Sequence, residues 1–171
     1  MRNTVCCLFL LIFSTNTFSV NSNLILSDSF PDKLSEFEFF VDDSAQEPHE
    51  KVIPYELIST LFSDYSYKQR WVYVPNNAKA SYVKDWVFDF PEGSALIKTF
   101  YYPVDERNPD LGKQLLETRL LLRKKDGWEA VSYVWTNNKM KPIKKLLEKP
   151  LMHHGLILWE MKDRCDIESQ T

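Results

Sequence analysis

The stretch that decides the fold is residues 114–135, which read QLLETRLLLRKKDGWEAVSYVW. The even positions of residues 116–122 hold Leu, Thr, Leu and Leu, so these side chains share one face of a β-strand. Asp126 and Gly127 follow, and both tolerate the positive φ angles that a tight hairpin turn requires. Residues 128–135 then return as the partner strand. The stretch therefore predicts an antiparallel β-hairpin.

Shorter β-favouring runs precede this hairpin, and proline, asparagine and glycine separate them. They predict strands at residues 70–74, 86–90 and 95–102, in addition to residues 114–123 and 128–135. Strands with such short connections are typical of antiparallel sheets. The sequence therefore predicts a mainly β fold, an antiparallel sandwich or open barrel, with a short helical or irregular lead-in and tail.

Changes in composition divide the chain into four parts. We expect a signal peptide at residues 1–22, a polar lead-in at 23–50, a β-rich module at 51–135 and a lysine-rich tail at 136–171. The module contains all eight tyrosines and four of the five tryptophans, so the core is expected there. A length of 171 residues leaves room for one such domain.

The first residues have the features of a signal peptide. Arg2 supplies a positive charge, and residues 5–13 are an unbroken apolar run. This run is shorter than the roughly 20 residues that cross a bilayer. The sequence therefore predicts export to the periplasm or the outside of the cell, and a retained membrane anchor is the alternative.

Two positions fit the expected cleavage of this peptide. Thr17 and Ser19 match the small-x-small pattern before a cut near Val20 or Asn23. Cleavage also removes Arg2, which changes the formal net charge from −3 to −3 − 1 = −4. A negative chain is not expected to attract nucleic acid or anionic lipid in general.

The cysteines predict a protein without an intramolecular disulfide. Cys6 and Cys7 leave with the signal peptide, so Cys165 remains alone. Stability must then come from packing.

Two segments lie outside the module. Residues 34–40 can form a short helix that packs Phe37, Phe39 and Phe40 on the module, or a solvated arm. The tail carries five lysines against a single glutamate over residues 136–149, and Pro142 and Pro150 interrupt it. It is expected to lie outside the β pattern, to be disordered or foreign to the module, and to contribute little to the fold.

Three charged residues lie deep within the β runs. Glu117 and Arg119 share one side of a strand, and Lys98 can reach them from a neighbouring strand. A carboxylate between two cations is more typical of a structural ion cluster than of a general base. We therefore expect Lys98, Glu117 and Arg119 to form a structural charge cluster.

A second group has the chemistry of a sugar site. Asp85, Asp89 and Glu92 can pair for glycoside-type acid and base catalysis, and Trp86 and Trp128 can stack on sugars or belong to the core. Nothing in the sequence fixes the separation of the carboxylates.

The remaining chemistry-bearing residues do not predict a site. His49 next to Glu50 is typical of a solvated pair, and adjacent His153 and His154 bind one metal poorly. Cys165 lies in a polar tail without a basic partner and is expected to be an ordinary free thiol. The sequence predicts no metal, no cofactor and no catalytic set.

Several motifs of the module, taken in their order, resemble the N-terminal region of a family of exported di-haem c-type cytochromes. They are VIPYEL at 52–57, LFSDY at 61–65, FPEG at 90–93, LIKTFYYP at 96–103, ETRLLLR at 117–123, DGW at 126–128 and YVW at 133–135. The resemblance covers residues 34–135. It implies a β-module and an exported location.

The haem chemistry of that family has no counterpart in this chain. Its haems attach downstream through Cys-x-x-Cys-His, a motif that the chain lacks, so no haem-binding residue is carried over. The resemblance and the β pattern both end after Trp135. This predicts a truncated or frame-shifted gene product, and the alternative is a stand-alone module with its own tail.

The functional expectation is an exported, non-catalytic binding or scaffold module whose partners are other exported proteins rather than nucleic acid. A small secreted domain that binds or hydrolyses carbohydrate is the alternative. A third hypothesis is electron transfer through haem supplied by a partner chain.

Overall fold

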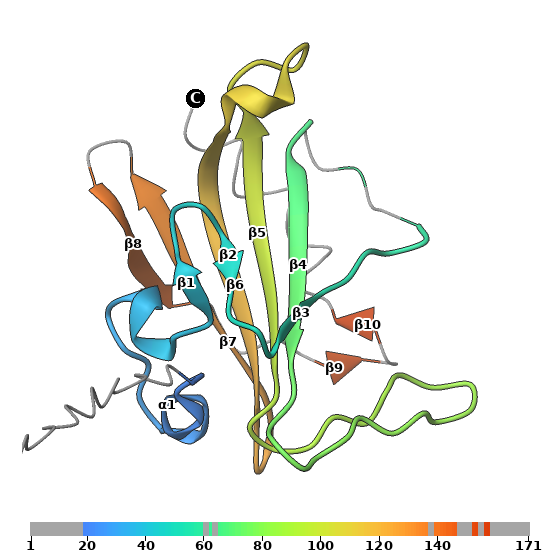
Figure 1. The fold of residues 1–171 in the computed structure, drawn as a ribbon. Helices are drawn as coiled ribbons and strands as arrows, with labels where there is room; N and C mark the ends of the chain where they lie inside the picture. The colour runs from blue at the N-terminus through green and yellow to red at the C-terminus, as the bar shows by residue number, and fades with distance from the viewer. Residues whose placement is uncertain are drawn as a thin grey trace, which may run out of the picture.

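The protein is mainly β, and its centre is one antiparallel sheet of six strands (Figure 1). This computed structural model describes residues 19–59, 62, 65–136, 139–146, 152–153 and 156–157. The strands are β3 (Val52–Pro54), β4 (Tyr67–Tyr73), β5 (Ala95–Pro103), β6 (Lys113–Lys124), β7 (Gly127–Thr136) and β8 (Lys139–Leu146). Each strand pairs with its neighbour in the chain, and β3 and β8 are the edges of an open sheet. The predicted mainly β, antiparallel fold is confirmed.

The predicted hairpin is present as β6 and β7. Lys124 pairs with Gly127, so Lys125 and Asp126 form the two-residue loop. Of Asp126 and Gly127, only the glycine has a positive φ, at 141°. The turn therefore begins one residue earlier than predicted, and Gly127 is the first residue of the returning strand.

The strand predicted at residues 86–90 is absent. This segment belongs to the long connection between β4 and β5, and its only ladder contact among the described residues is an isolated bridge between Ser81 and Asp89. A run with strand propensity becomes a strand only where a neighbour can pair with it. Here the chain has passed the end of β4, so no strand of the sheet lies alongside.

The sheet also extends beyond the predicted boundary at Trp135. Lys139–Leu146 forms β8 and pairs with β7, with Val134 opposite Ile143. Lysines and proline are frequent on edge strands, because an edge needs ladder hydrogen bonds on one side only. The features that separate this segment from the module in the sequence are thus compatible with an edge strand, and the expectation that the whole tail lies outside the fold is wrong.

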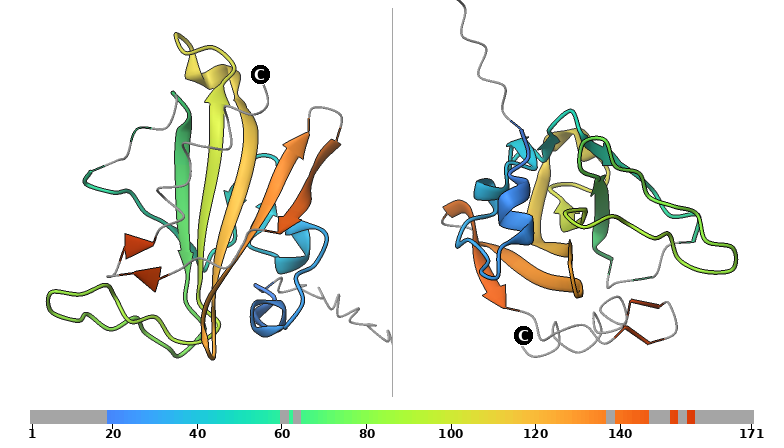
Figure 2. Two further views of the ribbon diagram at one scale, coloured as in Figure 1. Left: turned by 180° about the vertical axis from the view of Figure 1, so that it is seen from behind. Right: turned by 90° about the horizontal axis from the view of Figure 1, so that it is seen from below.

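The N-terminal segment covers one face of the sheet (Figures 1 and 2). It consists of α1 (Ser22–Leu26), the 3-10 helix η1 (Leu34–Phe37) and a small antiparallel pair, β1 (Phe40–Asp42) with β2 (Glu47–Pro48). The remaining elements are η2 (Pro109–Leu111), between β5 and β6, and a separate pair of β9 (Met152–His153) with β10 (Leu156–Ile157). None of the helices in the described ranges has both the length and the apolar character needed to span a membrane.

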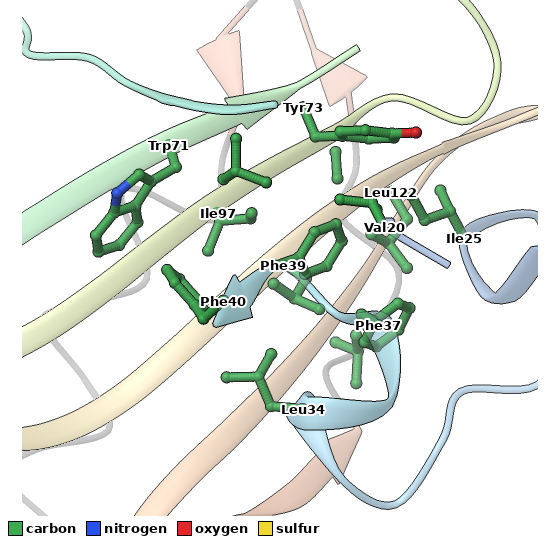
Figure 3. Packing of buried hydrophobic residues seen from close by; sticks show 14 of the residues in the cluster. Val20, Ile25, Leu34, Phe37, Phe39, Phe40, Trp71, Tyr73, Ile97 and Leu122 are labelled. Carbon is green, nitrogen blue, oxygen red and sulfur yellow. The ribbon is translucent and has the colours of Figure 1, made fainter. Parts of the chain in front are cut away.

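The core lies between this segment and the sheet (Figure 3). Phe37 stacks on Phe39 with ring centroids 5.2 Å apart and meets Tyr133 of β7 edge-on at 6.3 Å. Phe40 meets Trp71 of β4 edge-on at 5.0 Å. Each buried aromatic side chain contributes about 1.5–3 kcal/mol to stability. The phenylalanines therefore pack on the module, and the alternative of a solvated arm is wrong.

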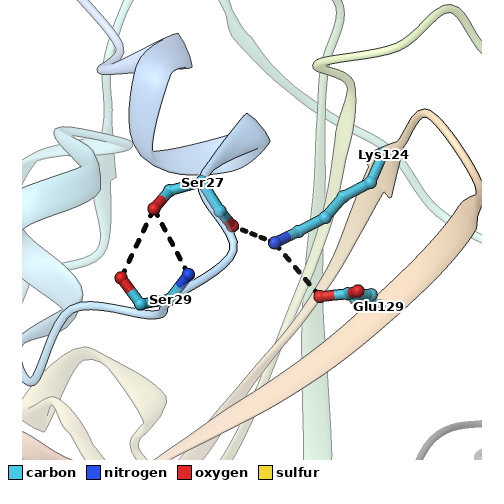
Figure 4. A network of polar contacts seen from close by, with 4 residues as sticks. All are labelled: Ser27, Ser29, Lys124 and Glu129. Atoms are coloured by element: carbon cyan, nitrogen blue, oxygen red, sulfur yellow. Dashed lines mark hydrogen bonds and ion pairs between the residues drawn. The ribbon is translucent and has the colours of Figure 1, made fainter.

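Polar contacts fasten the same segment to β6 and β7. The Tyr133 hydroxyl donates a hydrogen bond to the Pro31 carbonyl at 2.8 Å. Lys124, which is buried, donates to the Ser27 carbonyl and forms an ion pair with Glu129 at 3.1 Å (Figure 4). Two backbone carbonyls of the segment after α1 are thus tied to side chains of the β6–β7 hairpin.

Candidate functional site

A row of cations crosses the face of the sheet opposite the core. Arg70 on β4 is paired in register with Lys98 on β5, and Lys98 is paired with Arg119 on β6. Lys68 and Phe100 form the next pair on the same face of β4 and β5. Directly opposed like charges destabilise a sheet unless other groups compensate them.

Phe100 supplies part of this compensation. Its ring is buried, and the Lys98 ammonium lies 4.7 Å from the ring centroid. The Arg119 guanidinium lies 4.9 Å away and the Lys68 ammonium 5.8 Å away. Cations at these distances are attracted by the π face of the ring. One aromatic side chain therefore interacts with three positive charges.

Glu117 completes the charged face, by which we mean Lys68, Arg70, Lys98, Phe100, Glu117 and Arg119. One carboxylate oxygen accepts a hydrogen bond from Arg119 at 2.9 Å, and the other accepts one from the Ser132 hydroxyl. Lys98 lies over the same Phe100 ring as Arg119. The structure thus brings the three predicted residues Lys98, Glu117 and Arg119 together, with both oxygens of the carboxylate engaged in structural contacts.

A group of exposed aromatic residues lies elsewhere, on the connection between β4 and β5. We call residues 81–89 the aromatic loop. It projects away from the sheet as the green segment at the lower right of Figure 1. It presents five large hydrophobic side chains to solvent, namely Tyr82, Val83, Trp86, Val87 and Phe88. Trp86 is 61% exposed and Tyr82 74% exposed, which is unusual for residues of this size.

Backbone hydrogen bonds shape the aromatic loop. Ser81 and Asp89 exchange two of them, at 2.8 and 2.9 Å, which closes the base of the loop. The Trp86 amide donates to the Val83 carbonyl at 3.2 Å, and Asp85 within this turn has a positive φ of 60°. The loop is therefore a hydrogen-bonded turn with apolar side chains around its tip.

A chain of ring contacts connects the loop to the sheet. Tyr82 meets Phe88 edge-on at 6.0 Å, and Phe88 lies 6.4 Å from Phe90. Phe90 in turn meets Trp128, at the start of β7, edge-on at 5.8 Å. These contacts give the loop a base that is anchored on the β6–β7 hairpin.

The residues of the predicted sugar site are distributed along this loop and its base. Asp85 and Asp89 are exposed on the loop, and Glu92 is exposed where the chain returns to the sheet. Trp128 is partly buried against Phe90, whereas Trp86 has an accessible ring. Of the two tryptophans, only Trp86 is available as a stacking platform.

His49 differs from its predicted environment. It is buried, its amide donates to the Phe39 carbonyl at 2.9 Å, and its carbonyl accepts from Val52 at 2.8 Å. The predicted solvated pair with Glu50 is therefore wrong, because the β1–β2 pair folds His49 against the core. The side chains of His153, His154 and Cys165 lie outside the described residues.

Sequence reasoning missed the aromatic loop as a surface. Its signal is present in the sequence, since Tyr82-Val83 and Trp86-Val87-Phe88 are apolar and surround Lys84 and Asp85. Residues 86–90 have high β propensity, which predicts a strand there. Whether such a run is paired or projects into solvent depends on its neighbours in space.

Comparison with known proteins adds no relationship: no protein-family model, curated protein or solved structure matches this chain.

Proposed function

We propose that this protein is an exported, non-catalytic binding module that docks on another exported protein through its aromatic loop. The observation that carries the proposal is the exposure of five large hydrophobic side chains on one loop. Concentrated apolar surface of this kind marks interaction sites in soluble proteins. Because the ring contacts to Phe90 and Trp128 anchor the loop, little ordering is needed when a partner binds.

The chemistry of the tip favours a protein partner. Lys84 and Asp85 at the turn cancel in charge, and the whole chain has a formal net charge of −3, so attraction to anionic lipid is weak. Tryptophan and tyrosine dominate the binding energy of many protein interfaces, where they fill apolar pockets. The occupant of the tip is therefore a protein with an apolar recess that accepts Trp86 and its neighbours Val83 and Val87.

A carbohydrate ligand is the second candidate. The exposed ring of Trp86, with Asp85 and Asp89 on the same loop, supplies a stacking face and hydrogen-bond acceptors. This candidate predicts binding of glycans that depends on Trp86 and does not require another protein.

The motifs that resemble the N-terminal region of di-haem c-type cytochromes are consistent with the main proposal. They imply a β-module and an exported location, and the chain carries no haem-attachment motif to which electron transfer can be assigned.

A photo-cross-linking residue at position 86, in the full chain produced in its native host, tests the proposal. Val104 is a matched control position, because it is 62% exposed and lies in the loop after β5, at the other end of the sheet. The captured protein is then purified, and its affinity for the wild-type chain and for the Trp86→Ala and Val104→Ala variants is measured. Loss of a central tryptophan costs about 2 kcal/mol or more, which is at least roughly a thirtyfold rise in Kd.

Three outcomes decide between the candidates. Weaker binding of Trp86→Ala with unchanged binding of Val104→Ala supports the proposal. Equal cross-linking at the two positions contradicts it. Trp86-dependent binding to a glycan array, or to vesicles of neutral or anionic lipid, in the absence of a protein partner would replace it.

A further inference from the structure

The start of the described chain is part of the hydrophobic core. Val20 is only 6% exposed and packs in the cluster that includes Ile25 and Leu122 (Figure 3). Ser19, one residue earlier, is exposed. The boundary between solvent and core along the backbone therefore falls between Ser19 and Val20.

The next two residues are held by hydrogen bonds. The Asn21 amide donates to the Phe37 carbonyl at 2.9 Å, and the Asn21 side chain donates to the Glu36 carbonyl at 3.5 Å. The Ser22 amide donates to the Val20 carbonyl at 2.9 Å, and Ser22 begins α1. Residues 20–22 thus connect α1 with η1 and belong to the folded protein.

These contacts distinguish two possible cleavage positions. A cut before Asn23 would remove Val20 from the core and the Asn21 bonds to η1, and would shorten α1 at its first residue. A cut after Ser19 leaves all of these contacts in place. The small residues Thr17 and Ser19 stand three and one positions before that bond, as signal-peptide cleavage requires.

We propose that the Ser19–Val20 peptide bond is the processing site and that the mature protein begins at Val20. Water adds across this bond, the C–N bond breaks, Ser19 retains the new carboxylate and Val20 gains the new amino group. The inference rests on the proposed export, because only an exported chain meets a signal peptidase. It adds the position of the cut and a structural reason for it.

The full-length gene is expressed in an exporting host, and the N-terminus of the exported protein is determined by intact mass and N-terminal sequencing. The expected mature chain begins with the residues Val-Asn-Ser-Asn. Ser19→Leu places a bulky side chain next to the bond and should cause the precursor to accumulate. Ser22→Leu is the matched control, because Ser22 stands next to the alternative bond, and it should leave the Val20 terminus unchanged.

The outcomes separate the cleavage site from the export on which it rests. An exported protein that begins at Asn23, or elsewhere downstream of Val20, overturns the processing site and leaves export intact. A full-length chain that stays in the cytoplasm overturns both. If Ser22→Leu folds poorly, its N-terminus can still be read from total protein after a short metabolic pulse, since cleavage precedes folding.

Discussion

Among single residues, Glu117 is the anion on which the charged face depends. It engages Arg119 and Ser132 beside Lys98 and Lys68, which surround the same Phe100 ring. Glu117→Gln removes the negative charge but keeps the shape, so Arg119 remains among like charges. Breaking one partner of a partly buried ion pair is expected to lower the free energy of unfolding by about 2–4 kcal/mol, as measured by urea denaturation.

An exposed ion pair provides the control for this variant. Asp105 pairs with Arg107 at 3.3 Å, and the Arg107 side chain is 92% exposed. Asp105→Asn should change the free energy of unfolding by less than about 1 kcal/mol. If the two variants are equally stable, the charged face does not depend on Glu117.

Asp43 predicts a dependence of stability on pH. It lies in the turn between β1 and β2, where burial, assisted by the charge of Asp42, raises its pKa from 3.8 to about 6. The folded state therefore binds this proton more tightly than the unfolded chain, and the contribution of Asp43 to stability falls as the pH rises from about 4 through 6. Asp43→Asn should equal the wild type near pH 4 and be more stable than it at pH 8, as measured by urea denaturation at each pH.

The pKa of the neighbouring Asp42 is shifted in the opposite direction, so Asp42 serves as a control. Hydrogen bonds from the Ser44 hydroxyl and from the amides of Ala45 and Ser44 lower the pKa of Asp42. Asp42→Asn should therefore be less stable than the wild type at neutral pH, and the difference should shrink as the pH falls below 3.8 and disappear once the pH is below the lowered pKa of the folded state. Parallel curves for Asp43→Asn and the wild type would contradict the role assigned to Asp43.

Among the elements, the β6–β7 hairpin depends on the conformation of Gly127. Its φ of 141° is one that other residues rarely adopt, and an added Cβ would meet no atom within 4 Å. Gly127→Val should therefore destabilise the protein by backbone strain alone, by about 1–3 kcal/mol in thermal or urea denaturation. Asp126→Ala, in the exposed loop beside it, should have little effect. An unchanged melting temperature for Gly127→Val would show that the turn tolerates a side chain.

The same elements show what the sequence could and could not predict. The hairpin of β6 and β7 was predictable because the alternation of Thr118, Leu120 and Leu122 and the turn residues are local signals. The role of β8 was not predictable, because its pairing with β7 uses backbone groups that every sequence has. The same limit applies to Val20 and Ile25, whose burial is decided by strands that lie far along the chain.

The candidate site also has a part that the sequence predicts and a part that it does not. The charged face was predictable from Lys98, Glu117 and Arg119, because neighbouring strands and alternation place these residues on one side of the sheet. The contribution of Phe100 and the row from Arg70 to Arg119 could not be predicted, because both depend on the register between strands. The exposure of Trp86 could be recognised only from the structure, in which no strand of the main sheet lies beside residues 86–90.

For the molecule as a whole, β8 covers the side of β7 that would otherwise be the edge of the sheet. A chain that ends at Thr136 would leave the ladder groups of β7 unpaired, whereas one that ends at Leu146 would retain β8. The shorter chain should lose about 2–4 kcal/mol of unfolding free energy through several ladder hydrogen bonds, and should self-associate through the exposed edge. Urea denaturation and sedimentation velocity measure both effects.

The longer truncation is the control, since in the part of the chain that the structure describes β9 and β10 pair with each other and not with the main sheet. It should remain monomeric, with stability close to that of the full chain. If the chain that ends at Thr136 is as stable as the one that ends at Leu146, β8 contributes little to the sheet.

The position of the N-terminal segment also constrains when the protein can fold during its synthesis. The sheet itself can grow hairpin by hairpin, because strand order follows chain order. The core cannot form in this stepwise way, because the Pro31 carbonyl accepts a hydrogen bond from Tyr133, which the ribosome adds 102 positions later. Phe37 therefore leaves the ribosome long before its partner Tyr133 on β7 exists, and the interior of the protein can close only after nearly all of its described chain has been made.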